Sequence, residues 1–182
     1  TVSGNMTDGG TSNLIASPGG SIIRIGGSFT PETFTAADSQ VTFFGGSTAA
    51  AGSTAGPYTF NSLTIDKDVG GVIVSRNNWT VTGSLTLSRG QWTLGMGLSH
   101  TLFSDWDSSA ADFIFAAANS TVIFRGNTTM LTTNGFQASE AFYNISINKN
   151  ANQIVNMGSN VQIGGDLTIN TGELNTNNND IQ

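Results

Sequence analysis

The 182-residue chain contains no cysteine and few charged residues, six Lys plus Arg and twelve Asp plus Glu, with a net charge of −6. The lack of disulfides does not fix the compartment, because a long repetitive fold can do without them. The shortage of basic residues argues against nucleic-acid binding, which needs a basic surface. No apolar run reaches about 18 residues, so we expect no membrane span.

The residues that are present indicate a folded chain with an unusual surface. Hydrophobic residues make up 37% of the chain, which is enough to form a sizeable core, and 23 further residues are glycine. Asn, Gly, Ser and Thr take the solubilising role that Lys and Glu have in most cytosolic proteins. We therefore expect an extracellular or cell-surface location.

Two long stretches of the sequence are repeated. Residues 34–43 read FTAADSQVTF and residues 115–124 read FAAANSTVIF, with six of ten positions identical at an offset of 81. Residues 63–92 also align without a gap on residues 145–174 at an offset of 82, preserving the apolar spacing and the glycines. A third fragment, VSGNMT at residues 2–7, resembles VTGSLT at residues 81–86. Such self-similarity is typical of repeat architectures.

This repeat divides the chain into a partial unit, 1–33, a unit, 34–114, and an incomplete unit, 115–182, within one continuous segment, 1–182. Apolar residues alternate in short bursts such as Leu63-Thr-Ile65 and Leu85-Thr-Leu87. This period of two predicts strands buried on one face, and the Gly- and Asn-rich segments between them predict turns. No window has helical spacing over ten or more residues.

The predicted fold is all-β, a right-handed parallel β-helix, or β-solenoid, with roughly 20–25 residues per coil and a repeat unit of about 81 residues. About four coils per unit, and eight or nine in total, would stack so that equivalent residues of the repeat form one inward column. A β-sandwich of antiparallel hairpins is the alternative, but tight-hairpin turn sequences are rare here. Residues 48–57 are expected to form a surface loop. The predicted core comprises Phe43, Leu63, Ile65, Trp79, Val81, Leu85, Leu87, Trp92, Phe124, Ile145 and Leu167.

The segments FYNISI at 142–147, GGDLTI at 164–169 and TGEL at 171–174 resemble repeats of large secreted parallel β-helix proteins of bacteria and archaea. Adhesin-like and surface-layer-like or filament-like proteins belong to this group. The resemblance implies a β-helix on the cell surface with a structural or adhesive role. It carries over no functional residue.

The residues that could support catalysis or metal binding are few. His100 is the only histidine, and no Gly-x-Ser-x-Gly nucleophile motif accompanies it. Asp105 and Asp107, with Asp112 nearby, could form a weak calcium site, which is the one cofactor hypothesis. These carboxylates could also serve a glycosidase, with Trp92 and Trp106 as sugar contacts. We expect no enzyme and no catalytic residue, with Trp106 in the core and both flanking carboxylates in solvent.

Two further patterns concern polar residues. Asp66-Lys-Asp68 aligns with Asn148-Lys-Asn150, so the carboxylates are not preserved and the shared feature is a turn. The outward threonines at positions 64, 80, 86, 93 and 168 are expected on different faces of the coil, without the flat array that an ice-binding surface needs. Asn-x-Ser/Thr sequons, candidates for N-glycosylation, occur at Asn5, Asn78, Asn119, Asn127 and Asn144.

The expected function is that of a structural cell-surface protein, a building block of a fibre, sheath, surface layer or adhesin stalk. The chain begins and ends in the middle of a unit, so we expect either a longer rod or open coils covered by copies of the same chain. Head-to-tail or lateral homopolymers would follow. The alternative is a β-helix protein that binds or cleaves polysaccharide, with cell-surface glycans as partners.

Overall fold

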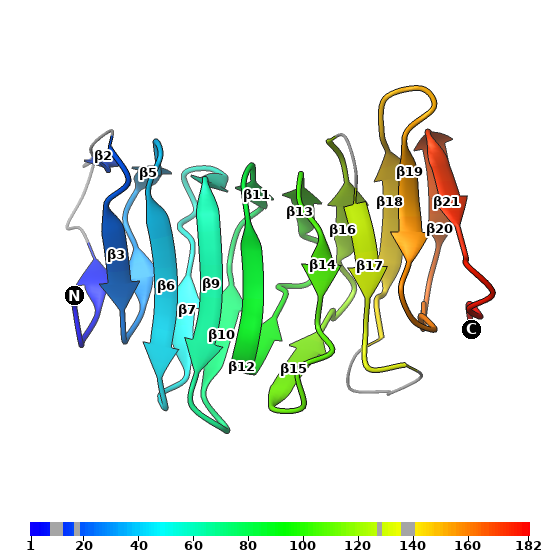
Figure 1. The fold of residues 1–182 in the computed structure, drawn as a ribbon. Coiled ribbons are helices and arrows are strands. Elements are labelled where there is room, and N and C mark those ends of the chain that lie inside the picture. Colours follow the sequence, from blue (N-terminus) through cyan, green and yellow to red (C-terminus); the bar gives the residue numbers. More distant parts are fainter. Residues whose placement is uncertain (8–12, 17–18, 127–128, 136–140) are drawn as a thin grey trace.

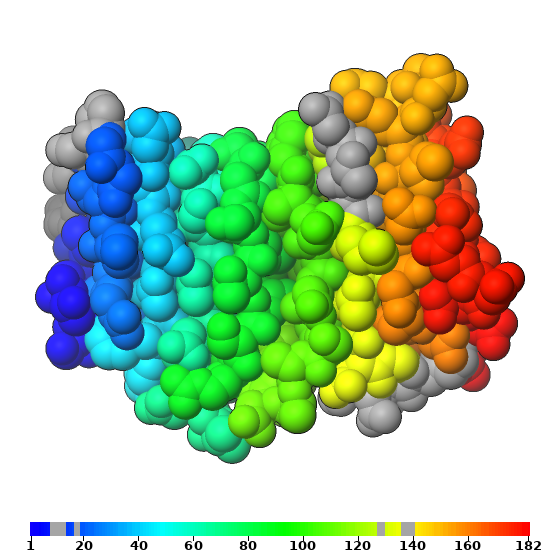
Figure 2. All heavy atoms as spheres, in the orientation of Figure 1, coloured from blue at the N-terminus to red at the C-terminus, as the bar shows by residue number. Residues whose placement is uncertain are grey.

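The computed structural model describes residues 1–7, 13–16, 19–126, 129–135 and 141–182. In these residues the chain forms strands and no helix, and the strands wind into a β-solenoid of about 7 turns. Figure 1 shows the coils side by side, with the two termini at opposite ends of the stack, and Figure 2 shows the coils in contact from end to end. The described strands pair in parallel, as in β9 with β12 and β16 with β18. The parallel β-helix prediction is confirmed, with fewer coils than expected.

The described strands form three sheets. The long sheet contains β2 (Asn13–Ile15), β5 (Thr33–Thr35), β8 (Tyr58–Phe60), β11 (Trp79–Val81), β13 (Ser99–Leu102), β16 (Thr121–Phe124), β18 (Asn144–Asn148) and β20 (Leu167–Thr171). The forked sheet contains β1 (Met6–Thr7), β3 (Ile22–Ile25), β4 (Phe29–Thr30), β6 (Gln40–Gly45), β7 (Ala49–Ala51), β9 (Ser62–Lys67), β10 (Val72–Ser75), β12 (Leu85–Thr93) and β15 (Phe113–Ala116). The short sheet contains β14 (Trp106–Asp107), β17 (Thr129–Thr132), β19 (Ile154–Met157) and β21 (Glu173–Asn175).

The long strand β12 explains why one sheet is forked. Its first half pairs with β9, and its second half, from Gly90 to Thr93, pairs with β10 and β15. The strand therefore runs across two sides of the solenoid, and each branch of the forked sheet forms one side. The long sheet forms the third side. Figure 1 shows the short sheet in the front layer, where it continues the β3-β6-β9-β12 branch.

The alternation of inward and outward side chains along each strand determines which residues form the core. In β9, Leu63, Ile65 and Lys67 are fully buried, while Ser62, Thr64 and Asp66 are only partly buried. This period of two is that of a pleated strand with one face inward. Because the coils are in register, inward side chains of successive coils meet in columns.

Aromatic rings form a continuous column through this core. Trp79 stacks on Trp92 with ring centroids 5.2 Å apart, and Trp92 stacks on Trp106 at 5.9 Å. Phe43 extends the stack below Trp79 at 6.1 Å, and Phe142 contacts Trp106 at 5.0 Å. Each such ring pair contributes about 0.5–1.5 kcal/mol beyond area burial. The column thus ties together coils that are distant in sequence.

Nine of the eleven predicted core side chains are at most 6% exposed: Phe43, Leu63, Ile65, Trp79, Val81, Leu87, Trp92, Phe124 and Ile145. Leu85 is half-buried. Leu167 is 37% exposed, so its prediction is wrong. It lies in β20, the last strand of the long sheet, and no described strand covers it.

The sequence repeat is out of phase with the coils. Leu63 lies in the forked sheet, whereas its counterpart Ile145 lies in the long sheet. Val81 belongs to the long sheet, whereas Ile163 pairs with Phe142 outside it. An offset of 82 residues therefore covers three complete coils and two of the three sides of the next coil, instead of the four complete coils that were expected. The prediction that repeat counterparts stack in one column is wrong, although most counterparts point inward.

Outward threonines do stack in columns, contrary to the prediction of one per face. In the long sheet Thr80 pairs with Thr59 on one side and Thr101 on the other. In the forked sheet Thr64 pairs with Thr86. The expected loop at 48–57 also contains a strand, β7, whose Ala49 and Ala51 are buried. The sequence alone did not give the register that creates these columns.

Replacing Ile65 by Asp should prevent folding, because Ile65 is fully buried and an unpaired buried charge costs several kcal/mol against a total stability of about 5–15 kcal/mol. Leu167→Asp is the matched control and should fold, since Leu167 is partly exposed. Circular dichroism and thermal melting measure both variants. Equal loss of structure in the two variants would contradict the assigned core.

Candidate functional site

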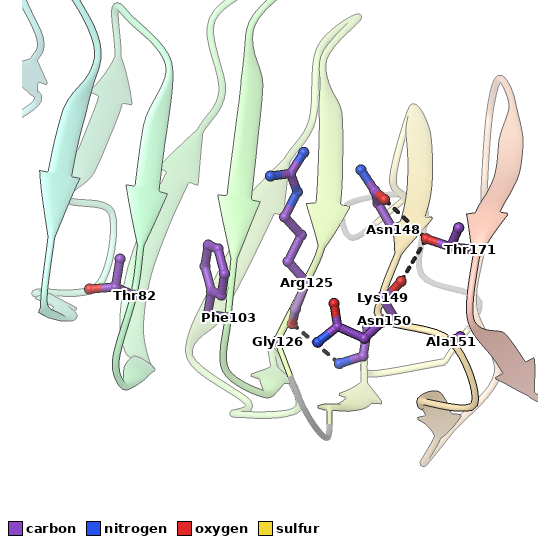
Figure 3. A pocket seen from close by; sticks show the side chains of 9 residues that line it. All are labelled: Thr82, Phe103, Arg125, Gly126, Asn148, Lys149, Asn150, Ala151 and Thr171. Atoms are coloured by element: carbon purple, nitrogen blue, oxygen red, sulfur yellow. Dashed lines mark hydrogen bonds between the residues drawn. The ribbon is translucent and has the colours of Figure 1, made fainter.

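A groove runs across the ends of the long-sheet strands. Its volume is about 880 Å³, and it is lined by Thr82, Phe103, Arg125, Gly126, Asn148, Lys149, Asn150, Ala151 and Thr171. Figure 3 shows these residues following one another from coil to coil, with Phe103 and Arg125 projecting from neighbouring strand ends.

Strand pairing positions the groove residues. Thr82, Phe103 and Arg125 each directly follow a strand of the long sheet, β11, β13 and β16. The Phe103 N–H donates to Val81 O at 3.0 Å, and the Arg125 N–H donates to Leu102 O at 2.7 Å. Backbone hydrogen bonds between coils therefore hold these side chains in a row. No sequence pattern indicates this groove, because its members come from successive coils and are roughly 22 residues apart.

A buried lysine lies at one end of the groove. Lys149 is 2% exposed, and its Nζ donates to Arg125 O at 3.2 Å. Burial lowers the pKa of Lys149, an effect that the carboxylate of Asp105 opposes. Thr171 on the next coil donates from Oγ1 to Lys149 O at 2.6 Å. The lysine thus binds the coil before it through its side chain and the coil after it through its carbonyl.

The repeat places a second buried lysine in an equivalent arrangement. Lys67, which is 0% exposed, donates from Nζ to Phe44 O at 2.8 Å and lies 3.4 Å from Gly26 O. Burial lowers its pKa, and Asp68 opposes this effect. The flanking Asp and Asn residues were predicted to form a turn, but the preserved residue is the lysine between them, whose burial was not predicted.

A β-bulge and a glycine accompany each lysine. Register shifts occur in β12 opposite β9 and in β20 opposite β18, one at each repeat position. Gly90 and Gly172 follow these bulges. A Cβ on Gly90 would lie 2.4 Å from the Cβ of Lys67, and a Cβ on Gly172 would lie 2.6 Å from the Cβ of Lys149. The preserved glycines therefore allow one coil to pass closely over the lysine of the coil before it.

His100 belongs to the core. It is 0% exposed, its ring lies edge-on to Trp79 at 5.7 Å and to Trp92 at 5.6 Å, and its Nε2 is 3.2 Å from Ser75 Oγ. Among the described residues its Nδ1 has no hydrogen-bond partner, and burial lowers its pKa from 6.5 to about 3. Ser75 is also 0% exposed, so this Ser–His contact does not reach a substrate.

The acidic residues of the predicted cluster lie on the surface around a buried tryptophan. Trp106 is fully buried, while Asp105 and Asp107 are exposed. Asp105 accepts a hydrogen bond from Met130 N at 2.6 Å, and Asp107 accepts two from Ser109, at 3.0 and 2.6 Å. In the described part of the chain, no three His, Cys, Asp or Glu residues gather as a metal site. The proposed sugar contacts Trp92 and Trp106 are wrong, because both rings are fully buried.

The sequons lie at coil corners. Asn5, Asn78 and Asn119 are exposed, Asn144 is partly buried, and Asn127 lies outside the described residues. The side-chain oxygens of Asn5, Asn78 and Asn144 each accept a hydrogen bond from a backbone N–H of the next coil, at 2.8, 2.9 and 2.7 Å. These amides therefore link coils, and their glycosylation stays a prediction.

No protein-family model, curated protein or solved structure matches this chain. Within the ranges that the structure describes, no helix has the length and apolar character to cross a membrane.

Gly90→Ala should lower the free energy of unfolding more than Gly97→Ala does. The φ angles are +80° and +72°, so both alanines carry left-handed strain of about 1–2 kcal/mol. At Gly90 the new Cβ would clash with Lys67, whereas at Gly97 no atom of the described residues lies within 4 Å of it. Denaturant titration measures both variants, and equal losses would contradict the close approach of the two coils.

The free energy of unfolding should fall on acidification because of His100. The unfolded chain binds a proton at this residue below about pH 6.5, whereas the folded chain does so only near pH 3. The contribution of His100 to the free energy of unfolding is therefore fully present above about pH 6.5. It is lost as the pH falls from 6.5 towards 3, by up to about 1.4 kcal/mol per pH unit. His100→Leu should show a shallower slope in urea titrations at pH 4–7. Identical slopes would refute the buried neutral imidazole.

Proposed function

We propose that the chain is a structural element of a cell-surface fibre, sheath, surface layer or adhesin stalk, assembled by stacking β-coils. The observation that carries this proposal is the parallel stacking of coils along the long sheet, which leaves β20 as an open edge within residues 1–182. All five residues of β20 are exposed, and Leu167 and Ile169 are 37% and 49% exposed. An open parallel edge with apolar side chains is a template for a further strand.

The opposite end of the stack carries apolar side chains as well. Leu14 in β2 and Ile23 in β3 pair with the buried Phe34 and Val41, and both are only partly buried. Apolar surface at both ends suits head-to-tail contact between copies of the chain. Such a contact is heterologous, so it gives an open filament unless it closes into a ring.

The proposed extracellular location rests on composition. Only 10% of residues are charged, and the chain has no cysteine. Outward positions of the long sheet carry hydroxyl and amide groups, as at Thr59, Thr80 and Ser146. A surface that depends on neutral polar groups is less sensitive to changes of salt, since screening acts on charges.

A second candidate function is polysaccharide binding. The specific observation in its favour is the groove at the ends of β11, β13, β16 and β18, which combines an exposed aromatic ring with amide and hydroxyl side chains. This function is compatible with a structural role.

Electron micrographs of the protein at increasing concentration should show filaments longer than one chain, which spans about 34 Å for about 7 coils at a spacing near 4.8 Å. Ile169→Lys should abolish them, because a charged edge strand opposes pairing. Ile114→Lys is the matched control and should still assemble, since Ile114 is similarly exposed, at 43%, but lies in β15 on the side of the stack.

Monodisperse monomers of the unaltered protein at every concentration would contradict the proposal. Loss of filaments in Ile114→Lys but not in Ile169→Lys would show lateral rather than head-to-tail contact and would contradict the assigned edge. Light scattering after size-exclusion chromatography provides the same comparison in solution.

A further inference from the structure

The groove shown in Figure 3 is a positively charged depression on an acidic chain. Arg125 and Lys149 are among its nine described lining residues, and none of these nine is a carboxylate. The whole chain, in contrast, carries a net charge of −6. Charges separated by more than about 8 Å are largely screened at physiological ionic strength. Asp105 acts on the buried Lys149, so Arg125 is the exposed cation among the nine lining residues.

The direction of the groove favours an extended ligand. Thr82, Phe103, Arg125 and Lys149 come from four successive coils, each at or just after the end of a long-sheet strand. Coils lie about 4.8 Å apart, so the groove offers a new side chain at each such step along the stack. This arrangement suits a polymer of small rings lying along the solenoid axis.

The side chains select the chemistry of the ligand. Phe103 is 38% exposed and offers an apolar ring face. Arg125 is exposed, and a guanidinium matches the planar geometry of a carboxylate. Thr82 and Asn150 are also exposed and can hydrogen-bond to hydroxyl groups. An aromatic face, neutral polar groups and one exposed cation together complement a sugar chain that carries carboxylates.

We propose that this groove binds an acidic polysaccharide, with a uronate carboxylate on Arg125 and a neighbouring sugar ring on Phe103. Lys149 adds its charge from beneath the surface, since it is 2% exposed and donates to Arg125 O. A nucleic acid fits less well, because its affinity depends on several basic contacts to phosphates. An ice surface fits less well too, because the site is concave and Phe103 and Arg125 project from it. The proposal rests on the second candidate function, polysaccharide binding in this groove, and is independent of filament formation.

Isothermal titration with a panel of oligouronates of different linkage tests the proposal, each compared with its uncharged methyl ester. At least one acid form should bind about tenfold more tightly than its ester, as loss of a charged hydrogen bond predicts. Arg125→Gln should remove this preference. Phe103→Ala should weaken binding of the acid and the ester alike, because the ring contact does not depend on charge.

Arg76→Gln is the matched control, since Arg76 is also exposed but lines a different depression, at the ends of β4, β7 and β10. This variant should bind as the unaltered protein does. Unchanged melting temperatures would show that all variants fold. The proposal is overturned if no oligouronate binds, if the preference for the acid survives Arg125→Gln, or if Arg76→Gln removes it. Binding of single-stranded RNA or of ice in place of the sugars would overturn it equally.

Discussion

Parallel backbone hydrogen bonding between each coil and the next is the constraint on which the rest of the structure depends. It fixes the register, and the register brings residues that are roughly 22 positions apart into contact. The tryptophan stack, the buried lysines and the groove all result from this one geometry. None of them requires residues that are close in sequence. A change of register in one coil would therefore disturb the core and the surface together.

The mismatch between the repeat and the coil has a structural consequence. Since 82 positions span three coils and two further sides, a segment that forms one side in the first unit forms another side in the second. The same apolar pattern must therefore be acceptable on more than one side of the solenoid. The features preserved between units are those that such a change of side leaves intact: inward apolar residues, and the lysine, bulge and glycine at the coil corner.

Much of the fold could be predicted from the sequence, because alternation along a strand reports burial directly. Leu63, Ile65 and Trp79 were identified in this way and are buried. The register could not be predicted, because coil length varies from 18 residues between Ile23 and Val41 to 26 between Leu131 and Met157. The threonine columns and the groove depend on that register. The buried lysines escaped prediction because Lys is rarely found inside a protein, and their partners are backbone carbonyls that no sequence pattern reveals.

Cysteine cross-linking tests the stacking of coils most directly, because the chain has no cysteine of its own. Thr80 and Thr101 are partners in β11 and β13, and neighbouring strands place their Cα atoms within the roughly 4.4–6.8 Å that a disulfide spans. Thr80→Cys with Thr101→Cys should form a disulfide under mild oxidation. Thr80→Cys with Thr64→Cys should not, since Thr64 lies in the forked sheet. A cross-link in the second pair and none in the first would contradict the parallel stack.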